Sequence, residues 1–265
     1  LAINAAEPVL AETIAAFAAR FAARGFRREA MTPAWGLAEN VTIATAHPPM
    51  LPPRVDRIDR AAAAAGRARR VGEGSAGIGC VAVGRPLPGC AIEIRDGDRR
   101  LGERAIGDVW LLSDSLLAGY GDDAVHASGE PRWLATGDRG YLADGDLFFV
   151  ARARDVIVIA GEKHAPHDVE TAINAVPGVR PGCAVAFGVH DVARGTEVLA
   201  AVVETRITDP EALSGLSRAI VAQVTRETGL ALRHLKLVPP GGIRKTTSGK
   251  LARAATRAEH GRELA

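Results

Sequence analysis

The 265-residue sequence predicts a fold that combines α/β and α+β architecture: a helical segment with a small β-barrel, followed by a separate small α+β domain with a central sheet. Two observations carry this prediction. Between residues 80 and 150, short alternating or apolar runs are separated by Gly and Asp, which is typical of a small antiparallel sheet or barrel. After Val150 the order becomes strand, helix, strand, strand, helix, strand, and about 110 residues suffice for such a unit to bury its own core.

The first part of the chain begins with a predicted helix over residues 8–24, which Gly25 ends. Its apolar residues recur at near-helical spacing: Leu10, Ile14, Phe17 and Phe21. Residues 54–70 mix six arginines with two aspartates around an alanine run, and we interpret this segment as a solvated helix and turn. The runs that indicate the antiparallel sheet are CVAVG from 80, CAIEIRD from 90, DVWLL from 108 and DLFFV from 146.

The second part is expected to begin near Ala151–Asp155. Its predicted strands are DVIVIAG from 155, CAVAFGV from 183, EVLAAVVE from 197 and HLKLV from 234. One helical stripe, which Pro177 and Gly178 end, comprises Val169, Ala172, Ile173 and Val176. The other, which Gly229 closes, comprises Leu213, Leu216, Ile220, Val221 and Val224.

Composition excludes several classes of protein. Lys and Arg number 33 against 31 Asp and Glu, so no field of one sign indicates a nucleic-acid partner or an acidic membrane. No apolar run approaches the roughly 18 residues of a membrane span, and the start lacks both an initiator Met and a secretion signal. Three scattered cysteines without metal-ligand spacing are expected in a reducing compartment. These features predict a cytoplasmic protein and leave open that it is a fragment.

The sharpest local motif is RKTTSGK at residues 244–250. Small hydroxyl residues and one glycine make a flexible turn that can approach a phosphate closely, and the lysines offset phosphate charge. The alternative is a solvated basic loop, and the motif alone does not decide between the two. It is not a Walker loop, because the GxxxxGK[ST] spacing and the strand-to-helix context are both missing.

Seven short motifs that occur in a fixed order are stronger evidence of resemblance to a protein family than any single motif. They are AAEP at 5–8, WGLAE at 35–39, GRPLPG at 84–89, TGD at 136–138, ARARD at 151–155, AGEKHAPHDVE at 160–170 and KTTSGK at 245–250. With this set the chain resembles the C-terminal half of the adenylate-forming superfamily, which contains acyl-CoA synthetases, peptide-synthetase adenylation domains and luciferases. Three segments are similar to those of its fatty acyl-AMP ligases: RIDRAAAAAGR from 57, KHAPHDVE from 163 and RPGCAVAFGV from 180.

The resemblance implies a division of the chain. Residues 1–151 are expected to be the C-terminal portion of the large nucleotide-binding domain, with residues 1–75 as a helical segment beside the adenine and residues 76–151 as a β-barrel-like subdomain. Residues 152–265 are expected to be the small mobile C-terminal domain, with Arg154 at the hinge.

The resemblance also implies a two-step reaction that uses ATP and Mg²⁺ and releases AMP. A fatty-acid carboxylate attacks the α-phosphate, which gives acyl-AMP and pyrophosphate. The phosphopantetheine thiol of an acyl carrier protein, or of a carrier domain in a polyketide or peptide synthase, then takes the acyl group. Because the first step gathers negative charge, catalysis needs cations and positioning more than proton transfer.

Carried over residue by residue, the resemblance assigns catalysis to Lys250, as the cation that reaches the carboxylate and the α-phosphate. Glu39 is expected to hold Mg²⁺, and Asp138 and Arg152 are expected to bind the ribose. The residues expected to border the adenine are Ala6, Glu7, Pro8, Trp35 and Gly36, with Trp35 either near the base or in the core.

The family's Ser/Thr/Gly-rich phosphate loop and most of the acyl tunnel are expected upstream of AAEP. The sequence therefore favours part of an active ligase that lacks its N-terminal half and is inactive alone. Two alternatives stay open: a catalytically incomplete nucleotide-binding or carrier-docking module, and a fragment of an acyl-CoA synthetase. Departures from the family pattern favour the incomplete module: Ala5, Trp35, Ala151 and Arg244. Retention of the charged site residues favours the ligase.

Overall fold

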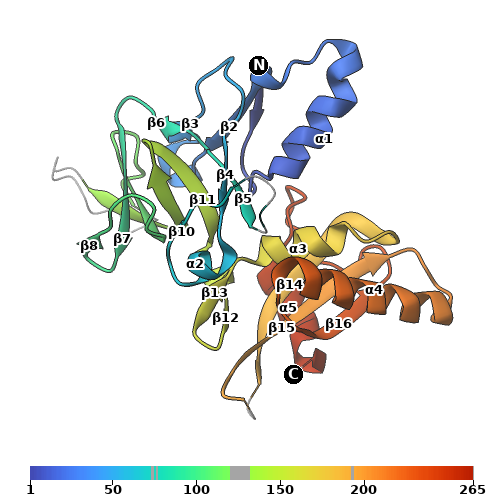
Figure 1. Cartoon of the computed structure of the whole chain (residues 1–265). Coiled ribbons are helices and arrows are strands. Elements are labelled where there is room, and N and C mark those ends of the chain that lie inside the picture. The colour runs from blue at the N-terminus through green and yellow to red at the C-terminus, as the bar shows by residue number, and fades with distance from the viewer. Residues whose placement is uncertain (73–74, 76, 120–131, 192–193, 265) are drawn as a thin grey trace. The chain divides into compact units, whose positions relative to one another are not determined.

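The computed structural model of the chain describes residues 1–72, 75, 77–119, 132–191 and 194–264. The chain divides into two compact units, Leu1–Ala153 and Arg154–Ala265, each with its own sheets and helices (Figure 1). The predicted mixture of helices and sheets is confirmed. The predicted subdivision of the first part begins at residue 76, which lies outside the described residues.

Two short parallel strands open the first unit. The sheet has the order β1-β2-β3-β6, with β1 parallel to β2. Its strands are β1 (Ala2–Asn4), β2 (Met31–Trp35), β3 (Thr45–Ala46) and β6 (Arg85–Pro86). Between β1 and β2, helix α1 (Ala11–Phe21) continues as the 3-10 turn η1 (Ala22–Arg24), and a second turn, η2 (Arg28–Ala30), precedes β2. The helix ends at the predicted Gly25, whose φ of 81° suits a residue without a Cβ atom.

The segment after residue 54 corrects the prediction of a solvated helix and turn. Strand β4 (Val55–Ile58) pairs antiparallel with β5 (Ile78–Val81), and only the short helix α2 (Arg60–Ala64) follows. Asp56 on β4 is buried, and it accepts hydrogen bonds from Arg104 and from the Tyr141 hydroxyl, both at 2.9 Å. A buried carboxylate is stable only where donors such as these compensate it. Because a charged residue stands where the pattern of a strand would have an apolar one, the sequence of β4 does not show the alternation that identifies a strand.

A five-stranded sheet, antiparallel throughout, forms the rest of the first unit in the order β11-β10-β9-β7-β8. Its strands are β7 (Cys90–Asp96), β8 (Arg99–Arg100), β9 (Gly107–Ser113), β10 (Trp133–Ala143) and β11 (Asp146–Arg152). Asp144 and Gly145 join β10 to β11 and both have positive φ, as a two-residue hairpin turn requires. This hairpin places Asp138 opposite Arg152.

The second unit is built on a three-stranded sheet that is buried on both faces. Its strands, in the order β14-β15-β16, are β14 (Val179–Asp191), β15 (Thr196–Thr205) and β16 (Leu232–Val238). Helices α3 (Pro166–Asn174) and α4 (Pro210–Thr228) pack Ile173 and Ile220 against one face. Ile243 and Leu264 pack with Phe187 on the other face. Burial on both sides explains the near-continuous apolar runs of β14 and β15.

Three elements of the second unit were not predicted. They are the 3-10 turn η5 (Ala153–Asp155), strand β13 (Glu162–His164), which forms a hairpin with β12 (Ile157–Ile159), and helix α5 (Arg253–Leu264). Strand β13 is short and polar, and α5 carries few apolar residues, so neither has a clear periodic pattern. Helix α4 ends at Gly229 as predicted. Among the described helices, none has both the length and the apolar character to cross a membrane.

Candidate functional site

The carboxyl ends of β1 and β2 lie side by side, because the strands are parallel and Asn4 stands opposite Pro33. The residues that follow or end these two strands are Ala6, Glu7, Pro8, Trp35 and Gly36, which is the full set predicted to border an adenine. In open α/β sheets, ligands bind beyond the carboxyl ends of the strands. The structure therefore brings all five residues to the edge of a sheet where a nucleotide can be held.

The backbone after β1 is strained at one alanine. Ala6 has a φ of 75°, in the left-handed region that favours glycine. The sequence departs from the family pattern at Ala5, whereas the unusual backbone conformation is at Ala6. Strain of this kind clusters at functional sites, where the surrounding structure holds it in place.

Asp138 is held beside the end of β2 by a hydrogen bond from Trp35. The indole Nε1 of Trp35 donates a 2.8 Å hydrogen bond to Oδ2 of Asp138, and the two residues are only 6% and 3% exposed. Arg152, opposite Asp138 in the hairpin, places its Nε 3.0 Å from Oδ1 of that carboxylate. The backbone N–H of Asp138 donates to the Thr136 hydroxyl at 3.2 Å, which holds the preceding turn. Trp35, Asp138 and Arg152 are therefore in direct contact.

The ring of Trp35 belongs to the hydrophobic core of the first unit. It shares a cluster of buried side chains with Ala44, Val83 and Leu111. Only the polar edge of the indole is directed to the Asp138 carboxylate. Trp35 thus connects the core to the candidate ribose-binding residue.

Glu39 lies in a tightly shaped loop after β2, on the 3-10 turn η3 (Ala38–Asn40). Its carbonyl oxygen accepts a 2.7 Å hydrogen bond from the backbone of Leu117. Gly36 is required at the start of the loop, because a Cβ atom there would lie 1.7 Å from the carbonyl oxygen of Thr42. Val41 has φ 63° and ψ −64°, a γ-turn conformation that is rare and strained. These constraints fix the backbone that carries Glu39.

Lys250 lies in the second unit, in a closed loop over residues 244–252. Ala252 donates to the carbonyl of Arg244 at 2.9 Å, and Thr246 donates to the carbonyl of Lys250 at 2.8 Å. The backbone N–H of Lys250 donates in return to the Thr246 hydroxyl at 3.1 Å. These bonds give the loop a defined shape, and the Lys250 side chain is partly exposed.

The structure does not place all the predicted site residues in one unit. The first unit, Leu1–Ala153, contains the five residues at the ends of β1 and β2, which we call the nucleotide-edge residues. It also contains Glu39, Asp138 and Arg152, whereas Lys250 is in the second unit, Arg154–Ala265. Arg154, the predicted hinge, is the first residue of the second unit, and its side chain is exposed. The lysine and the nucleotide edge are therefore carried by two separately folded bodies.

No family model matches the chain, but individual proteins do. The long-chain-fatty-acid–AMP ligase FadD28 of Mycobacterium tuberculosis is 32% identical over 277 residues, which are 96% of this chain and 46% of that protein. FadD21 of Mycobacterium leprae, which carries the name of a fatty-acid–CoA ligase, is 31% identical over 275 residues, with the same 96% and 46% coverage. The chain spans about half the length of these curated relatives.

Solved structures agree with this similarity. A fatty acyl-adenylate ligase, from work on the E. coli and L. pneumophila enzymes, superposes with a TM-score of 0.88 at 32% identity, over 99% of this chain and 47% of that chain. The chain corresponds to the C-terminal half of an adenylate-forming enzyme, and the relatives that it matches carry the name of fatty-acid AMP ligases. A second structure, McyG A-PCP complexed with phenylalanyl-adenylate, has a TM-score of 0.78 at 27% identity, over 99% of this chain and 44% of that chain.

The carboxylate of Glu39 can be compared with the ligands that Mg²⁺ takes in proteins. Mg²⁺ in phosphate-transfer sites is held by one or two carboxylates together with substrate phosphates. Glu39 supplies one such carboxylate on a rigid loop. Within the described residues, no group of three or more His, Cys, Asp or Glu could hold a metal ion. A single carboxylate such as that of Glu39 would fit Mg²⁺ together with other ligands, for example the phosphates of a nucleotide.

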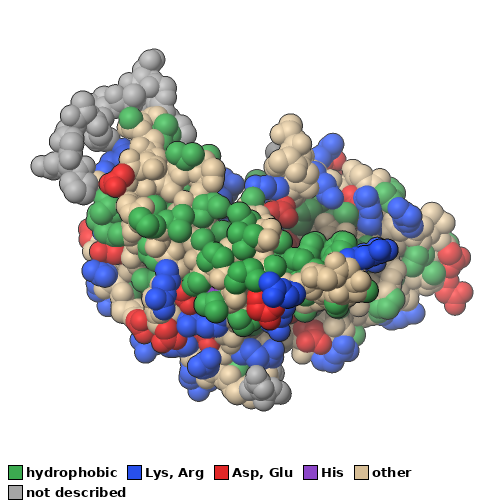
Figure 2. Space-filling model, turned by 90° about the horizontal axis from the view of Figure 1, so that it is seen from above, with side chains coloured by type: hydrophobic (Ala, Val, Ile, Leu, Met, Phe, Trp, Pro, Cys, Tyr) green, Lys and Arg blue, Asp and Glu red, His purple; other side chains and the backbone are tan. Residues whose placement is uncertain are grey.

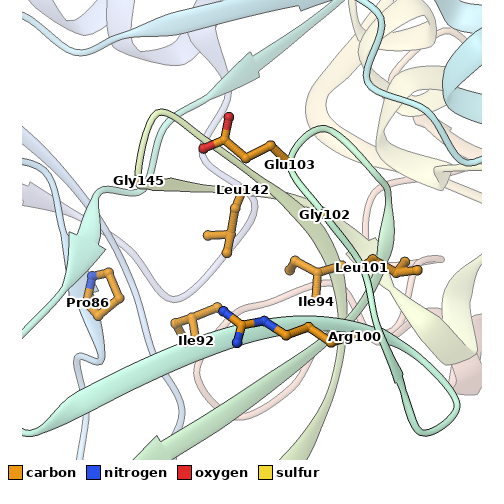
Figure 3. Close-up of a pocket in the computed structure, with 9 residues that line it drawn as sticks. All are labelled: Pro86, Ile92, Ile94, Arg100, Leu101, Gly102, Glu103, Leu142 and Gly145. Atoms are coloured by element: carbon orange, nitrogen blue, oxygen red, sulfur yellow. The ribbon is translucent and has the colours of Figure 1, made fainter.

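The first unit also contains a pocket of about 370 Å³ beside β7 and β10. In Figure 3 the side chains of Ile92, Ile94 and Leu142 converge, whereas the Glu103 carboxylate points away from them. The other lining residues are Pro86, Arg100, Leu101, Gly102 and Gly145. None of the nucleotide-edge residues lines this pocket, so it is separate from the candidate site.

Sequence reasoning missed the contacts that hold the site residues in place, although Thr136 and Glu170 belong to the motifs TGD and AGEKHAPHDVE. Thr136, Glu170, Glu204 and Arg253 all make such contacts. Arg253 stood close to the KTTSGK motif, but its partner Glu170 is 83 residues away. The local sequence around either residue does not show that the two form a pair.

Proposed function

We propose that the chain is the C-terminal half of a ligase that uses ATP and Mg²⁺ to activate a fatty acid as acyl-AMP, for transfer to a phosphopantetheine thiol. The observation that carries this proposal is the contact among Trp35, Asp138 and Arg152 at the carboxyl ends of two parallel strands. A carboxylate at this edge suits ribose hydroxyls, because its oxygens only accept hydrogen bonds. The relatives named as long-chain fatty-acid AMP ligases support the reaction.

In this proposal a ribose hydroxyl replaces Arg152 at one oxygen of Asp138. The Arg152 side chain is 48% exposed, whereas the Asp138 side chain is 5% exposed, so the arginine can swing away without disturbing the core. Trp35 meanwhile keeps Oδ2 fixed from the buried side. The guanidinium then remains close enough to donate to the nucleotide, since Arg152 stands opposite Asp138 in the hairpin.

Lys250 supplies positive charge to the adenylation step. A carboxylate oxygen of the fatty acid bonds to the α-phosphorus while the bond to pyrophosphate breaks, so three negatively charged groups meet. A lysine ammonium is a compact charge on a long stem, and a positioned charge of this kind stabilises the transition state. Bound Mg²⁺ would neutralise phosphate charge, with Glu39 as its protein ligand. Residues 152–265 would move as the small domain about Arg154 and carry Lys250 to residues 1–151, the portion of the large domain.

The acceptor thiol in this proposal belongs to an acyl carrier protein or to a carrier domain of a polyketide or peptide synthase. The similarity to McyG A-PCP supports a carrier domain as partner. The name of FadD21 keeps the alternative open that CoA accepts the acyl group, as in an acyl-CoA synthetase.

A missing N-terminal half would complete the site. Strand β1 is at the edge of its sheet, with β2 as its only neighbour among the described strands. Phe17 and Phe21 of α1 are exposed, with ring centroids 4.7 Å apart. Figure 2 shows hydrophobic side chains exposed between charged ones on the surface in view. Because an edge strand presents backbone N–H and C=O groups that another strand can pair with, the β1 edge suits a continuation of the sheet by the proposed N-terminal half.

ATP–pyrophosphate exchange with medium- and long-chain fatty acids tests the proposal. Exchange is expected from the chain joined to its N-terminal half, and none from the chain alone. In the joined protein, Lys250→Ala should remove more than about 3 kcal/mol of transition-state stabilisation. Lys236→Ala is the matched control and should leave the rate unchanged. Absence of exchange from the joined protein, or exchange that does not depend on Lys250, would contradict the proposal and favour an incomplete nucleotide-binding or carrier-docking module.

A further inference from the structure

Two buried carboxylates of the second unit hold the two ends of the lysine loop, residues 244–252. Glu204 on β15 is 1% exposed and accepts hydrogen bonds from the backbone N–H groups of Gly241 at 2.9 Å and Ile243 at 3.1 Å. Glu170 on α3 is 5% exposed and binds Arg253, the first residue after the loop. Both ends of the loop are therefore attached to the body of the unit.

The attachment after the loop is a two-pronged ion pair. Arg253 donates from Nε to Oε1 of Glu170 at 2.8 Å and from Nη2 to Oε2 at 2.6 Å. The backbone N–H of Ala186 on β14 donates to the same Oε1 at 3.1 Å, so the carboxylate is also fixed to the central sheet. A planar guanidinium that binds a carboxylate through two bonds fixes direction as well as distance, which a lysine cannot do.

A third nitrogen of Arg253 connects the loop to the start of the unit. Nη1 lies 3.4 Å from Oδ2 of Asp155, the residue directly after Arg154. Arg253 itself follows Lys250 by three positions. One guanidinium therefore joins the segment next to the hinge, helix α3 and the chain beside the lysine.

We propose that Arg253 is a positioning residue for Lys250, held by Glu170 and Asp155 so that the lysine loop moves with the hinge segment as one body. This inference rests on the proposed function, because that function assigns the catalytic charge to Lys250. Hydrogen bonds inside the loop give it its shape. The hydroxyl and glycine residues inside the loop are exposed, so the attachments at its ends help to fix where that shape lies on the second unit. A misplacement of about 1 Å at a reacting centre can cost about a hundredfold in rate.

Amide hydrogen exchange in the 265-residue chain tests the positioning of the loop. In Arg253→Gln, exchange at residues 246–252 should accelerate by about tenfold, the loss expected for one charge-assisted contact, while β15 amides keep their wild-type rates. Arg253→Lys keeps the positive charge but cannot bind Glu170 through two parallel hydrogen bonds, so its exchange rates at residues 246–252 should lie between those of wild type and Arg253→Gln. The matched control is Arg257→Gln, one turn along α5, where the guanidinium lies 3.6 Å from Glu197. This control should leave loop exchange unchanged.

Pyrophosphate exchange by the complete ligase tests whether the residue acts through the lysine. Arg253→Gln should lower kcat by about tenfold with the KM for ATP unchanged, and Arg253→Lys should restore part of it. In a Lys250→Ala background, Arg253→Gln should have no further effect. If Arg253→Gln does not fold, Asp155→Asn is the substitute. It weakens the 3.4 Å contact with Arg253 and a 3.8 Å contact with the exposed Arg154, and should give a smaller acceleration confined to residues 246–252.

Two results would overturn the inference. One is unchanged exchange of the loop in a folded Arg253→Gln or Asp155→Asn chain. The other is a loss of activity in Arg253→Gln that persists undiminished in the Lys250→Ala background. If the complete wild-type ligase shows no pyrophosphate exchange, the proposed function fails, and the hydrogen-exchange result alone then decides whether Arg253 positions the loop.

Discussion

Trp35 and Asp138 are 103 residues apart in the sequence and share a buried hydrogen bond of 2.8 Å from the indole Nε1 to Oδ2. The bond links β2 of one sheet to β10 of another. Because an indole N–H only donates and a carboxylate only accepts, the contact fixes the orientation of both side chains. The candidate ribose-binding carboxylate is therefore oriented before any nucleotide binds.

Trp35→Phe should lower the free energy of unfolding of the first unit by about 1–3 kcal/mol, because a buried carboxylate oxygen loses its donor. Urea denaturation followed by the fluorescence of the remaining tryptophans measures this loss. The matched control is Trp133→Phe, whose ring stacks under Arg95 at 4.9 Å and should lose about 0.5–1 kcal/mol. Equal losses at the two positions would show that the hydrogen bond to Asp138 adds nothing to stability.

Gly36→Ala should destabilise the first unit by about 1–3 kcal/mol, since the new Cβ forces the Glu39 loop to move. The methyl group would otherwise lie 1.7 Å from the carbonyl oxygen of Thr42. Gly215→Ala is the matched control in the interior of α4, where an added Cβ meets no atom within 4 Å. That control should stabilise the second unit by about 0.5–1 kcal/mol. A Gly36→Ala chain with wild-type stability would mean that the loop opens without cost.

Acid should weaken the second unit through Glu204. Burial acts to raise the pKa of its carboxyl group, but hydrogen bonds from Ile243, Arg180 and Gly241 outweigh burial and hold the pKa below its ordinary value. A carboxyl group with a lowered folded pKa contributes stability that is fully present above its unfolded pKa, about 4.3, and is lost as the pH falls through the folded pKa. The free energy of unfolding of the second unit should therefore fall below about pH 4.3.

Glu204→Gln should lower the stability of the second unit at pH 7 and flatten its dependence on acid. The stability of the second unit can be followed by amide hydrogen exchange of β15 between about pH 3 and 7, after each rate is corrected for the intrinsic exchange rate at that pH. The control is Glu227→Gln, an exposed residue on α4 that pairs only with its neighbour Arg226 and with Gln223 among the described residues. Identical acid profiles for wild type and Glu204→Gln would contradict the assignment to Glu204.

Ala160→Asn should stabilise the β12–β13 hairpin by about 0.5–1 kcal/mol, because asparagine tolerates the left-handed backbone that its turn requires. Ala160 and Gly161 have φ values of 50° and 84°. Thermal unfolding followed by circular dichroism measures the change. Ala175→Asn, at a right-handed position with φ −76°, is the control and should not stabilise the chain.

The alternation of strands and helices in the second unit could be predicted because the sheet is buried on both faces. Strands that are buried on both faces have nearly continuous apolar sequences, as β14 and β15 do. Gly229 marks the end of α4. Strand β4 could not be recognised, because the buried charge of Asp56 depends on Arg104 and Tyr141, which are far along the chain. Helix α5 was missed since few of its residues are apolar.

The candidate site was predicted in parts rather than as an arrangement. The motifs indicated Trp35, Asp138, Arg152 and Lys250, but no local pattern reveals that an indole would hold Asp138. The same holds for the ion pair of Arg253 and Glu170, which only the folded second unit brings together. Motif residues can be read from sequence, whereas the residues that hold them belong to tertiary structure.

A single peptide bond joins Ala153 to Arg154 and makes any meeting of the two units an intramolecular event. A short tether of this kind gives a partner group an effective concentration in the millimolar range. Under the proposed function, the ammonium of Lys250 would therefore not need strong attraction to the first unit. Weak attraction would also let the small domain of the proposed ligase separate quickly, so that the acceptor thiol could approach the acyl-AMP.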